Sequence, residues 1–255
     1  MKLTQKNLAA QLYTLRDYAK TPAEIADTLK KVKVIGYDAV QVSGLGPIDP
    51  VELKKILDGE GLVCCATHDG GDAFFDATND LIDKLHTLNC KHVAFPYPYM
   101  KPQTEAEWLE LAKRLNVIGA QLRAEGITLT YHNHNLELVR FSDKTVLELM
   151  YETTDPENLQ AEIDTYWIQM GGCDVIEWCA RMKNRLPLLH LKDCGVRNME
   201  TTMMEIGYGN LKWKDIIRTA DESGCEWYIV EQDICPASPF DSLKKSYDYI
   251  VTNLF

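Results

Sequence analysis

Eight short apolar runs recur along the chain, and this repetition restricts its fold more than any other feature. Their starts lie about 24 to 40 residues apart, the length of one strand, one crossover helix and two loops. The segments between them carry apolar residues at helical spacing. Eight such units predict a closed (β/α)8 barrel, a single domain over residues 1–255, with a doubly wound sheet as the alternative. The predicted strands are residues 8–12, 38–42, 62–66, 92–95, 127–131, 159–163, 186–189 and 226–230.

Helix-boundary signals separate the runs. A residue that tolerates a left-handed backbone follows five of the helical segments, as is typical of helix ends: Gly36, Gly61, Asn89, Gly126 and Gly224. Thr21, Asp49 and Ser238 each stand before a proline, the order expected of a helix N-cap and first turn. Thr104 and Glu107 form a predicted capping box.

The composition restricts the partners. Lys and Arg number 27 against 38 Asp and Glu, a net charge of −11, which disfavours nucleic acid and anionic membrane surfaces. No stretch approaches 18 uncharged apolar residues, so no membrane span is predicted. The eight cysteines include no CxxC pair, and no apolar segment follows the N-terminal lysines. We therefore expect free thiols and a cytoplasmic location.

Polar residues stand at the predicted carboxyl ends of the strands, where a barrel of this kind places its chemistry. Asp164, His190 and Glu231 occupy comparable positions on three consecutive strands. One imidazole and two carboxylates predict a site for a divalent metal: Mn, Zn, Co, Fe or Mg. Glu137 is a candidate fourth ligand, provided that the chain folds back across the mouth.

Further polar residues at the mouth are candidates for catalysis and substrate binding. His68 follows the third strand and is either a catalyst or a structural histidine. Lys192 lies in an otherwise apolar strand, where burial requires an anion or a substrate oxygen. The loop at residues 206–210 could present backbone amides to an anionic ligand, or simply begin a helix. The predicted substrate-binding residues are Gln11, Tyr13, Gln41, His134 and Trp167.

Several segments in the right order resemble the sugar phosphate isomerase/epimerase superfamily with a xylose isomerase-like barrel. They are Gln-Leu-Tyr-Thr-Leu-Arg-Asp at 11–17, Tyr-His-Asn-His at 131–134, Ile-Asp-Thr-Tyr-Trp at 163–167, His-Leu-Lys-Asp at 190–193 and Gly-Tyr-Gly at 207–209. The resemblance covers essentially the whole chain. It implies one divalent metal held by a strand-5 carboxylate, a strand-6 aspartate, a strand-7 histidine and a strand-8 glutamate.

Asp164, His190 and Glu231 match the last three of these ligands, whereas the first position differs. His132 stands where many relatives carry the strand-5 glutamate, so either His132 or Glu137 supplies the fourth ligand, or the metal is weakly held. Gln41 stands where a strand-2 glutamate is common.

The resemblance implies an isomerase or epimerase that acts on a carbohydrate by proton transfer through an enediolate. Glu231 would move the proton together with a second base, His132 or His68, and Lys192 would stabilise the oxyanion. A dehydratase or other lyase of a keto-sugar or inosose is the alternative, and a metal-free sugar-binding barrel is a third reading. An endonuclease for abasic DNA is disfavoured by the net charge of −11. The expected partner is a small carbohydrate, and homo-oligomers are known among relatives.

Overall fold

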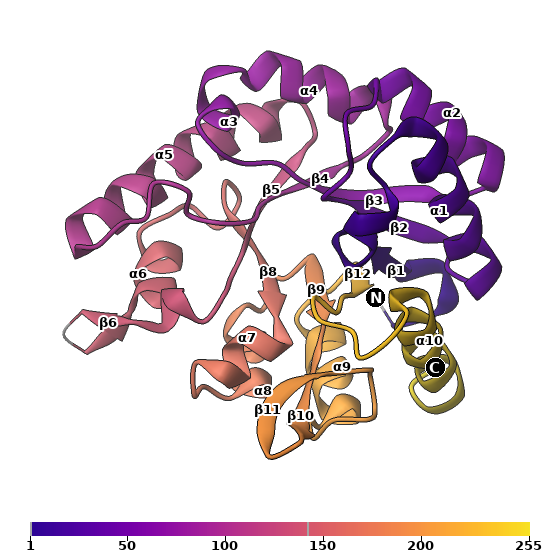
Figure 1. The fold of residues 1–255 in the computed structure, drawn as a ribbon. Coiled ribbons are helices and arrows are strands. Elements are labelled where there is room, and N and C mark those ends of the chain that lie inside the picture. The colour runs from indigo at the N-terminus through magenta and orange to yellow at the C-terminus, as the bar shows by residue number, and fades with distance from the viewer. Residues whose placement is uncertain (1, 142) are drawn as a thin grey trace.

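The computed structural model describes residues 2–141 and 143–255 and contains a closed barrel of eight parallel strands (Figure 1). The strands neighbour one another in the order β1-β12-β9-β8-β5-β4-β3-β2. The first and last of them pair in parallel, with Leu8 opposite Tyr228, and so close the barrel. This confirms the predicted (β/α)8 architecture. The barrel strands are β1 Leu8–Gln11, β2 Ala39–Val42, β3 Val63–His68, β4 His92–Phe95, β5 Thr128–His132, β8 Gln160–Asp164, β9 Leu188–Leu191 and β12 Trp227–Val230.

The observed strands begin and end within two residues of the predicted runs. The seventh run shifts because Pro187 has no backbone N–H to donate to a ladder. The Pro187 carbonyl instead accepts from the backbone N–H groups of Glu226 and Trp227, and β9 begins one residue later.

Helices surround the barrel on the outside (Figure 1). The predicted boundaries are confirmed: Thr21 and Thr104 form capping boxes, and Gly61 ends its helix in the left-handed region with φ 65°. None of the described helices is both long enough and apolar enough to cross a bilayer. The α-helices are α1 Pro22–Ile35, α2 Pro50–Glu60, α3 Ala73–Asp76, α4 Thr78–Thr87, α5 Glu105–Ala124, α6 Val146–Glu152, α7 Thr165–Met170, α8 Val175–Arg181, α9 Trp213–Glu222 and α10 Pro239–Asn253.

Two antiparallel hairpins interrupt the βα repeat, and neither was predicted. Strand β10 (Asp193–Arg197) pairs with β11 (Glu200–Met204) directly after β9, and β6 (Arg140–Phe141) pairs with β7 (Lys144–Thr145) after β5. We had predicted that Lys192 lies inside the seventh barrel strand. That prediction is wrong, because β9 ends at Leu191 and Lys192 lies between β9 and β10. Short 3-10 helices complete the described elements: η1 Gln5–Asn7, η2 Leu12–Tyr18 and η3 Leu136–Leu138.

Small and apolar side chains fill one layer of the barrel interior, and this layer positions the site. Ala9, Leu188 and Ile229 belong to one buried cluster. Each stands two residues before a polar residue at the strand end, and alternate residues of a strand face the same side. The polar residues that follow, including His190 and Glu231, therefore face inward above an apolar floor.

Candidate functional site

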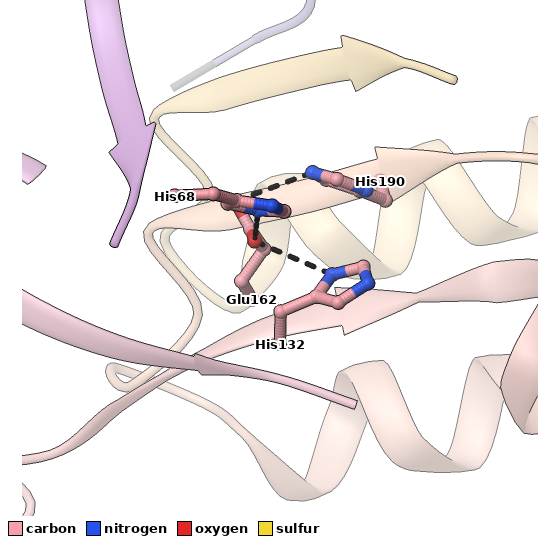
Figure 2. A group of neighbouring side chains, drawn as sticks. All are labelled: His68, His132, Glu162 and His190. Atoms are coloured by element: carbon pink, nitrogen blue, oxygen red, sulfur yellow. Dashed lines mark hydrogen bonds and ion pairs between the residues drawn. The ribbon is translucent and has the colours of Figure 1, made fainter. Parts of the chain in front are cut away.

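Glu162 lies at the centre of a polar layer inside the barrel, where three histidines converge on it (Figure 2). Its Oε2 is 2.6 Å from His68 Nε2 and 3.3 Å from His132 Nδ1, and its Oε1 is 3.3 Å from His190 Nε2. Burial opposes ionisation of this fully enclosed carboxyl, but His190 and His68 outweigh that effect and hold its pKa well below the usual value. Glu162 is thus a buried carboxylate that orients three imidazoles.

A chain of side-chain amides supports Glu162 from the other side. Gln41 donates from Nε2 to Glu162 Oε1 at 2.6 Å, and Gln11 donates from Nε2 to Gln41 Oε1 at 2.7 Å. We had predicted that Gln11 and Gln41 bind substrate. Both are fully buried and absent from the cavity lining, so the structure places them beneath the site, where they hold Glu162.

His190 connects this lower layer to an upper layer of polar side chains, which contains Asp164, Lys192, Glu231 and Asp233. Its Nε2 is 2.6 Å from Gln41 Oε1, which can only accept, so this nitrogen carries a proton. Its Nδ1 is 2.9 Å from Glu231 Oε2 and 3.7 Å from Asp164 Oδ2. Burial opposes the charged ring, but Glu162 and Glu231 raise the pKa of His190 well above its usual value. The structure thus brings together the three residues that the sequence singled out for a metal.

Lys192 is buried among three carboxylates of the upper layer. Its Nζ lies 2.7 Å from Glu231 Oε2 and 3.0 Å from both Asp164 Oδ2 and Asp233 Oδ2. Burial opposes the ammonium charge, but these carboxylates raise the pKa of Lys192 well above its usual value. The reciprocal effect of Lys192 and His190 outweighs burial and holds the pKa of Glu231 well below its usual value.

Four residues of the upper layer fit a divalent cation. His132, Asp164, His190 and Glu231 each offer one donor atom, and all four atoms lie within 4.8 Å of one another. Asp164 Oδ1 accepts from the backbone N–H of Trp167, whereas its buried Oδ2 accepts no hydrogen bond and forms an ion pair with Lys192 Nζ at 3.0 Å. Two imidazoles and two carboxylates are a donor set for Mn²⁺, Zn²⁺, Co²⁺ or Fe²⁺.

The charges of the two layers also favour an added cation. Four carboxylates, including Glu162 and Asp233, face the two cations Lys192 and His190. A second group, made of His68, His132, Glu162 and His190, has comparable spacing. It contains one carboxylate, which already accepts hydrogen bonds from Gln41 and His68, so the upper group suits a metal better.

Glu137 does not join either group of donors. Its Oε1 accepts from the Tyr131 hydroxyl at 2.7 Å and its Oε2 accepts from the His134 backbone N–H at 2.7 Å. Burial raises the pKa of Glu137 to about 7. Of the two candidates for the fourth donor, the structure brings His132 to the other three and turns Glu137 away.

A cavity of about 480 Å³ opens above the upper layer. The predicted residues Tyr13, His68, His134 and Trp167 all line it, together with Lys192 and Glu231. The rings of His134 and Trp167 lie 5.4 Å apart, and burial lowers the pKa of His134 to about 3, so this imidazole is neutral. Further lining residues were not predicted: Arg16, Ser43, Pro96, Tyr97, Tyr99, Asp233 and Ile234.

Two amides of the glycine-containing loop at 206–210, those of Gly207 and Gly209, face a carboxylate of the protein itself. Asp193 Oδ2 accepts from the backbone N–H groups of Gly207 and Gly209 at 2.8 and 3.1 Å, and from Trp213 Nε1 at 2.7 Å. A Cβ on Gly209 would meet Asp193 Oδ1 at 2.3 Å, so the carboxylate fits only against glycine. Of the two readings of this loop, the structure supports the one in which it leads into α9.

The sequence analysis missed two functional carboxylates, each of which stands two residues from a predicted site residue. Glu162 stands two residues before Asp164, and Asp233 stands two residues after Glu231. Alternation along β8 turns Glu162 and Asp164 toward the same side, whereas Glu231 and Asp233 both follow the last residue of β12. Applying that alternation to each strand-end residue would have found Glu162.

Relatives of known name include two inosose dehydratases. The one from Mesomycoplasma hyopneumoniae is 28% identical over 292 residues, which span 98% of this chain and 96% of that protein. The match to the one from Clostridium perfringens is 26% identical over 164 residues and spans 57% of this chain and only 54% of that relative.

Solved structures share the fold. A sugar phosphate isomerase/epimerase from Parabacteroides distasonis superposes with a TM-score of 0.83 at 22% identity, covering 98% of this chain and 95% of that one. A xylose isomerase-like TIM barrel protein from Mycobacterium smegmatis, solved in complex with magnesium, gives a TM-score of 0.76 at 16% identity, covering 97% and 96%. A family model described as xylose isomerase-like TIM barrel matches residues 29–250. Because that match covers most of the chain, the protein belongs to the xylose isomerase-like TIM barrel family.

Proposed function

We propose that this protein is a divalent-metal-dependent isomerase or epimerase that moves a proton next to the carbonyl of a keto-sugar or related polyol. One observation carries the proposal. The Glu231 carboxylate lines the cavity and lies within 3 Å of both His190 Nδ1 and Lys192 Nζ, beside a four-residue donor set for a cation. A base, a cationic side chain and a metal site at one cavity floor are the parts that enolisation requires.

His132, Asp164, His190 and Glu231 would hold the metal. A bound divalent cation polarises a carbonyl and its neighbouring hydroxyl, which lowers the free energy of an enediolate. The excess of carboxylates over cations supports this assignment, as does the magnesium complex of the related barrel from Mycobacterium smegmatis.

Among the residues of the chain, Glu231 removes the proton and the Lys192 ammonium stabilises the negative charge that then forms on the substrate oxygen. The low pKa of Glu231 makes it a weak base while Lys192 and His190 both contact it. When Lys192 turns to a substrate oxygen, it stabilises the developing oxyanion and removes one of the cations that lower the pKa of Glu231. His132 lines the same cavity, and burial and then His190 lower its pKa, so its neutral ring can accept a proton as a second base, while the protonated Glu231 is the group that returns one.

The cavity walls suit a sugar ring. Trp167 and Tyr97 flank His134, with ring centroids 5.4 Å from it in each case. Aromatic faces pack against the C–H faces of a ring, while neighbouring polar groups bond its hydroxyls. A small carbohydrate is therefore the substrate class that we propose.

A second candidate function is a dehydratase, which begins with the same proton abstraction and then expels water. Elimination needs an acid beside the leaving hydroxyl, and the Asp233 carboxyl lines the cavity next to Lys192. The curated relatives named inosose dehydratases favour this candidate.

The test follows a panel of keto-sugars and inososes by NMR in D₂O, with ultraviolet absorbance to detect an enone. Deuterium at the carbon next to the carbonyl with a new epimer or isomer supports the first candidate, whereas an enone with loss of water supports the second. Glu231→Gln keeps the side-chain volume and should abolish either reaction. Near-normal turnover by that variant would remove Glu231 from the mechanism.

A further inference from the structure

The Lys192 ammonium contacts the same two carboxylates that a metal ion in this site would use as ligands. Its Nζ contacts Glu231 Oε2 at 2.7 Å and Asp164 Oδ2 at 3.0 Å. Both carboxylates belong to the four-residue donor set. The lysine and the metal therefore share two of their partners.

The shared oxygen of Asp164 has no substitute on that side chain. Asp164 Oδ1 caps α7 by accepting from the Trp167 N–H at 2.9 Å, so Oδ2 is the atom left for a cation. That oxygen is buried, and Lys192 Nζ at 3.0 Å is closer to it than His190 Nδ1 at 3.7 Å. A divalent ion and an ammonium that contact one carboxylate oxygen lie close together in a site shielded from water, where like charges repel strongly.

A third carboxylate outside the donor set can keep its ion pair with Lys192 when a metal binds. Asp233 Oδ2 is 3.0 Å from the same Nζ, and Asp233 is not in the donor set. Its side chain is 21% exposed and lines the cavity, whereas those of Asp164 and Glu231 are almost fully buried. The Trp167 ring centroid lies 5.5 Å from Nζ, and this ring lines the same cavity. A lysine stem is flexible, so the head group can keep Asp233 while leaving the other two.

We propose that Lys192 is an internal competitor for the metal: it neutralises Asp164 and Glu231 in the metal-free protein and withdraws toward Asp233 when a divalent cation binds. This inference rests on the proposed function, because it requires the donor set to hold a metal. The exchange keeps the buried carboxylates neutralised in both states. It also frees the ammonium from Asp164 and Glu231 only in the metal-bound state, where it can meet a substrate oxygen.

The test is the affinity for Mn²⁺, measured by isothermal titration calorimetry on protein stripped with a chelator. Lys192→Met removes the charge at similar length and should bind Mn²⁺ at least tenfold more tightly than the unmodified protein. Lys183→Met, at an exposed lysine after α8, is the matched control and should leave the affinity unchanged. Lys192→Gln provides a second uncharged variant in case the first folds poorly.

Asp233→Asn separates the two parts of the idea. Removing the receiving carboxylate should weaken Mn²⁺ binding when Lys192 is present and should have little effect in the Lys192→Met background. Equal Mn²⁺ affinity of the unmodified protein and both Lys192 variants, or weaker binding by those variants, would overturn the competition while leaving the metal site intact. Absence of Mn²⁺ binding in every variant would instead overturn the metal dependence in the proposed function.

Discussion

Replacing Glu162 by Gln exchanges one buried oxygen for an NH₂ group with almost no change in volume. The carboxylate accepts from Gln41 Nε2 on one oxygen and contacts His68 Nε2 on the other, each at 2.6 Å. Gln can accept on one side only. Its NH₂ group must then face either the Gln41 amide donor or a His68 Nε2 that has to give up its proton, and His190 loses a buried counter-charge 3.3 Å away.

The cost follows from these contacts. Breaking a buried charged pair by removing one partner costs about 3 to 5 kcal/mol. At the low end, about 3 kcal/mol corresponds to a decrease of roughly 6 to 12 °C in the melting temperature for a chain of this size. Because the pKa of Glu162 is held below its usual value of 4.5, the carboxylate stabilises the fold above that pH and the contribution is lost as the pH falls below it.

Thermal unfolding of metal-free protein, followed by circular dichroism at about pH 7.5, measures the effect. Glu110→Gln, at an exposed carboxylate of α5, controls for the substitution itself. A loss below about 0.5 kcal/mol for Glu162→Gln, the level of an ordinary surface substitution, would refute the assignment of Glu162 as the organiser of the histidines.

Two further substitutions test neighbouring parts of the account. The pKa of Glu137 is raised from 4.5 to about 7, so the folded state binds more protons between these values and stability falls as pH rises through that window. Glu137→Gln removes this dependence. In denaturant titrations, the free energy of unfolding of Glu137→Gln relative to that of the unmodified protein should therefore rise by up to about 3 kcal/mol between pH 4.5 and 8. A difference between the two proteins that stays constant over this pH range would contradict the raised pKa. Asp193→Asn places an NH₂ group against the amides of Gly207 and Gly209 and should cost about 1.5 to 3 kcal/mol. Amide hydrogen exchange should then quicken in the loop at 206–210, and unchanged protection there would refute the role of Asp193.

The barrel was predictable because its strands are buried on both faces and interrupted by residues with strong backbone preferences. The helical segments before the third and fourth strands end near Gly61 and Asn89, whose positive φ values of 65° and 51° close these helices. The β10–β11 hairpin was not predictable in the same way. Its residues are a mixed polar and apolar stretch, stabilised by pairing across the hairpin rather than by burial between helices.

The site was predictable only at strand ends. Asp164, His190 and Glu231 stand out because they terminate apolar runs. Glu162 lies inside such a run, and nothing local shows that three histidines from other strands meet it. Likewise, the sequence does not reveal that the amides around Gly207 point to Asp193 rather than to a ligand.

The metal content of protein purified without chelators decides whether the four-residue donor set holds a metal, in comparison with Asp164→Ala and Glu137→Gln. We expect about one equivalent of a divalent transition metal in the unmodified protein and in Glu137→Gln, and almost none in Asp164→Ala, because Asp164 belongs to the donor set and Glu137 does not. Metal retained by Asp164→Ala, or lost from Glu137→Gln, would contradict this expectation.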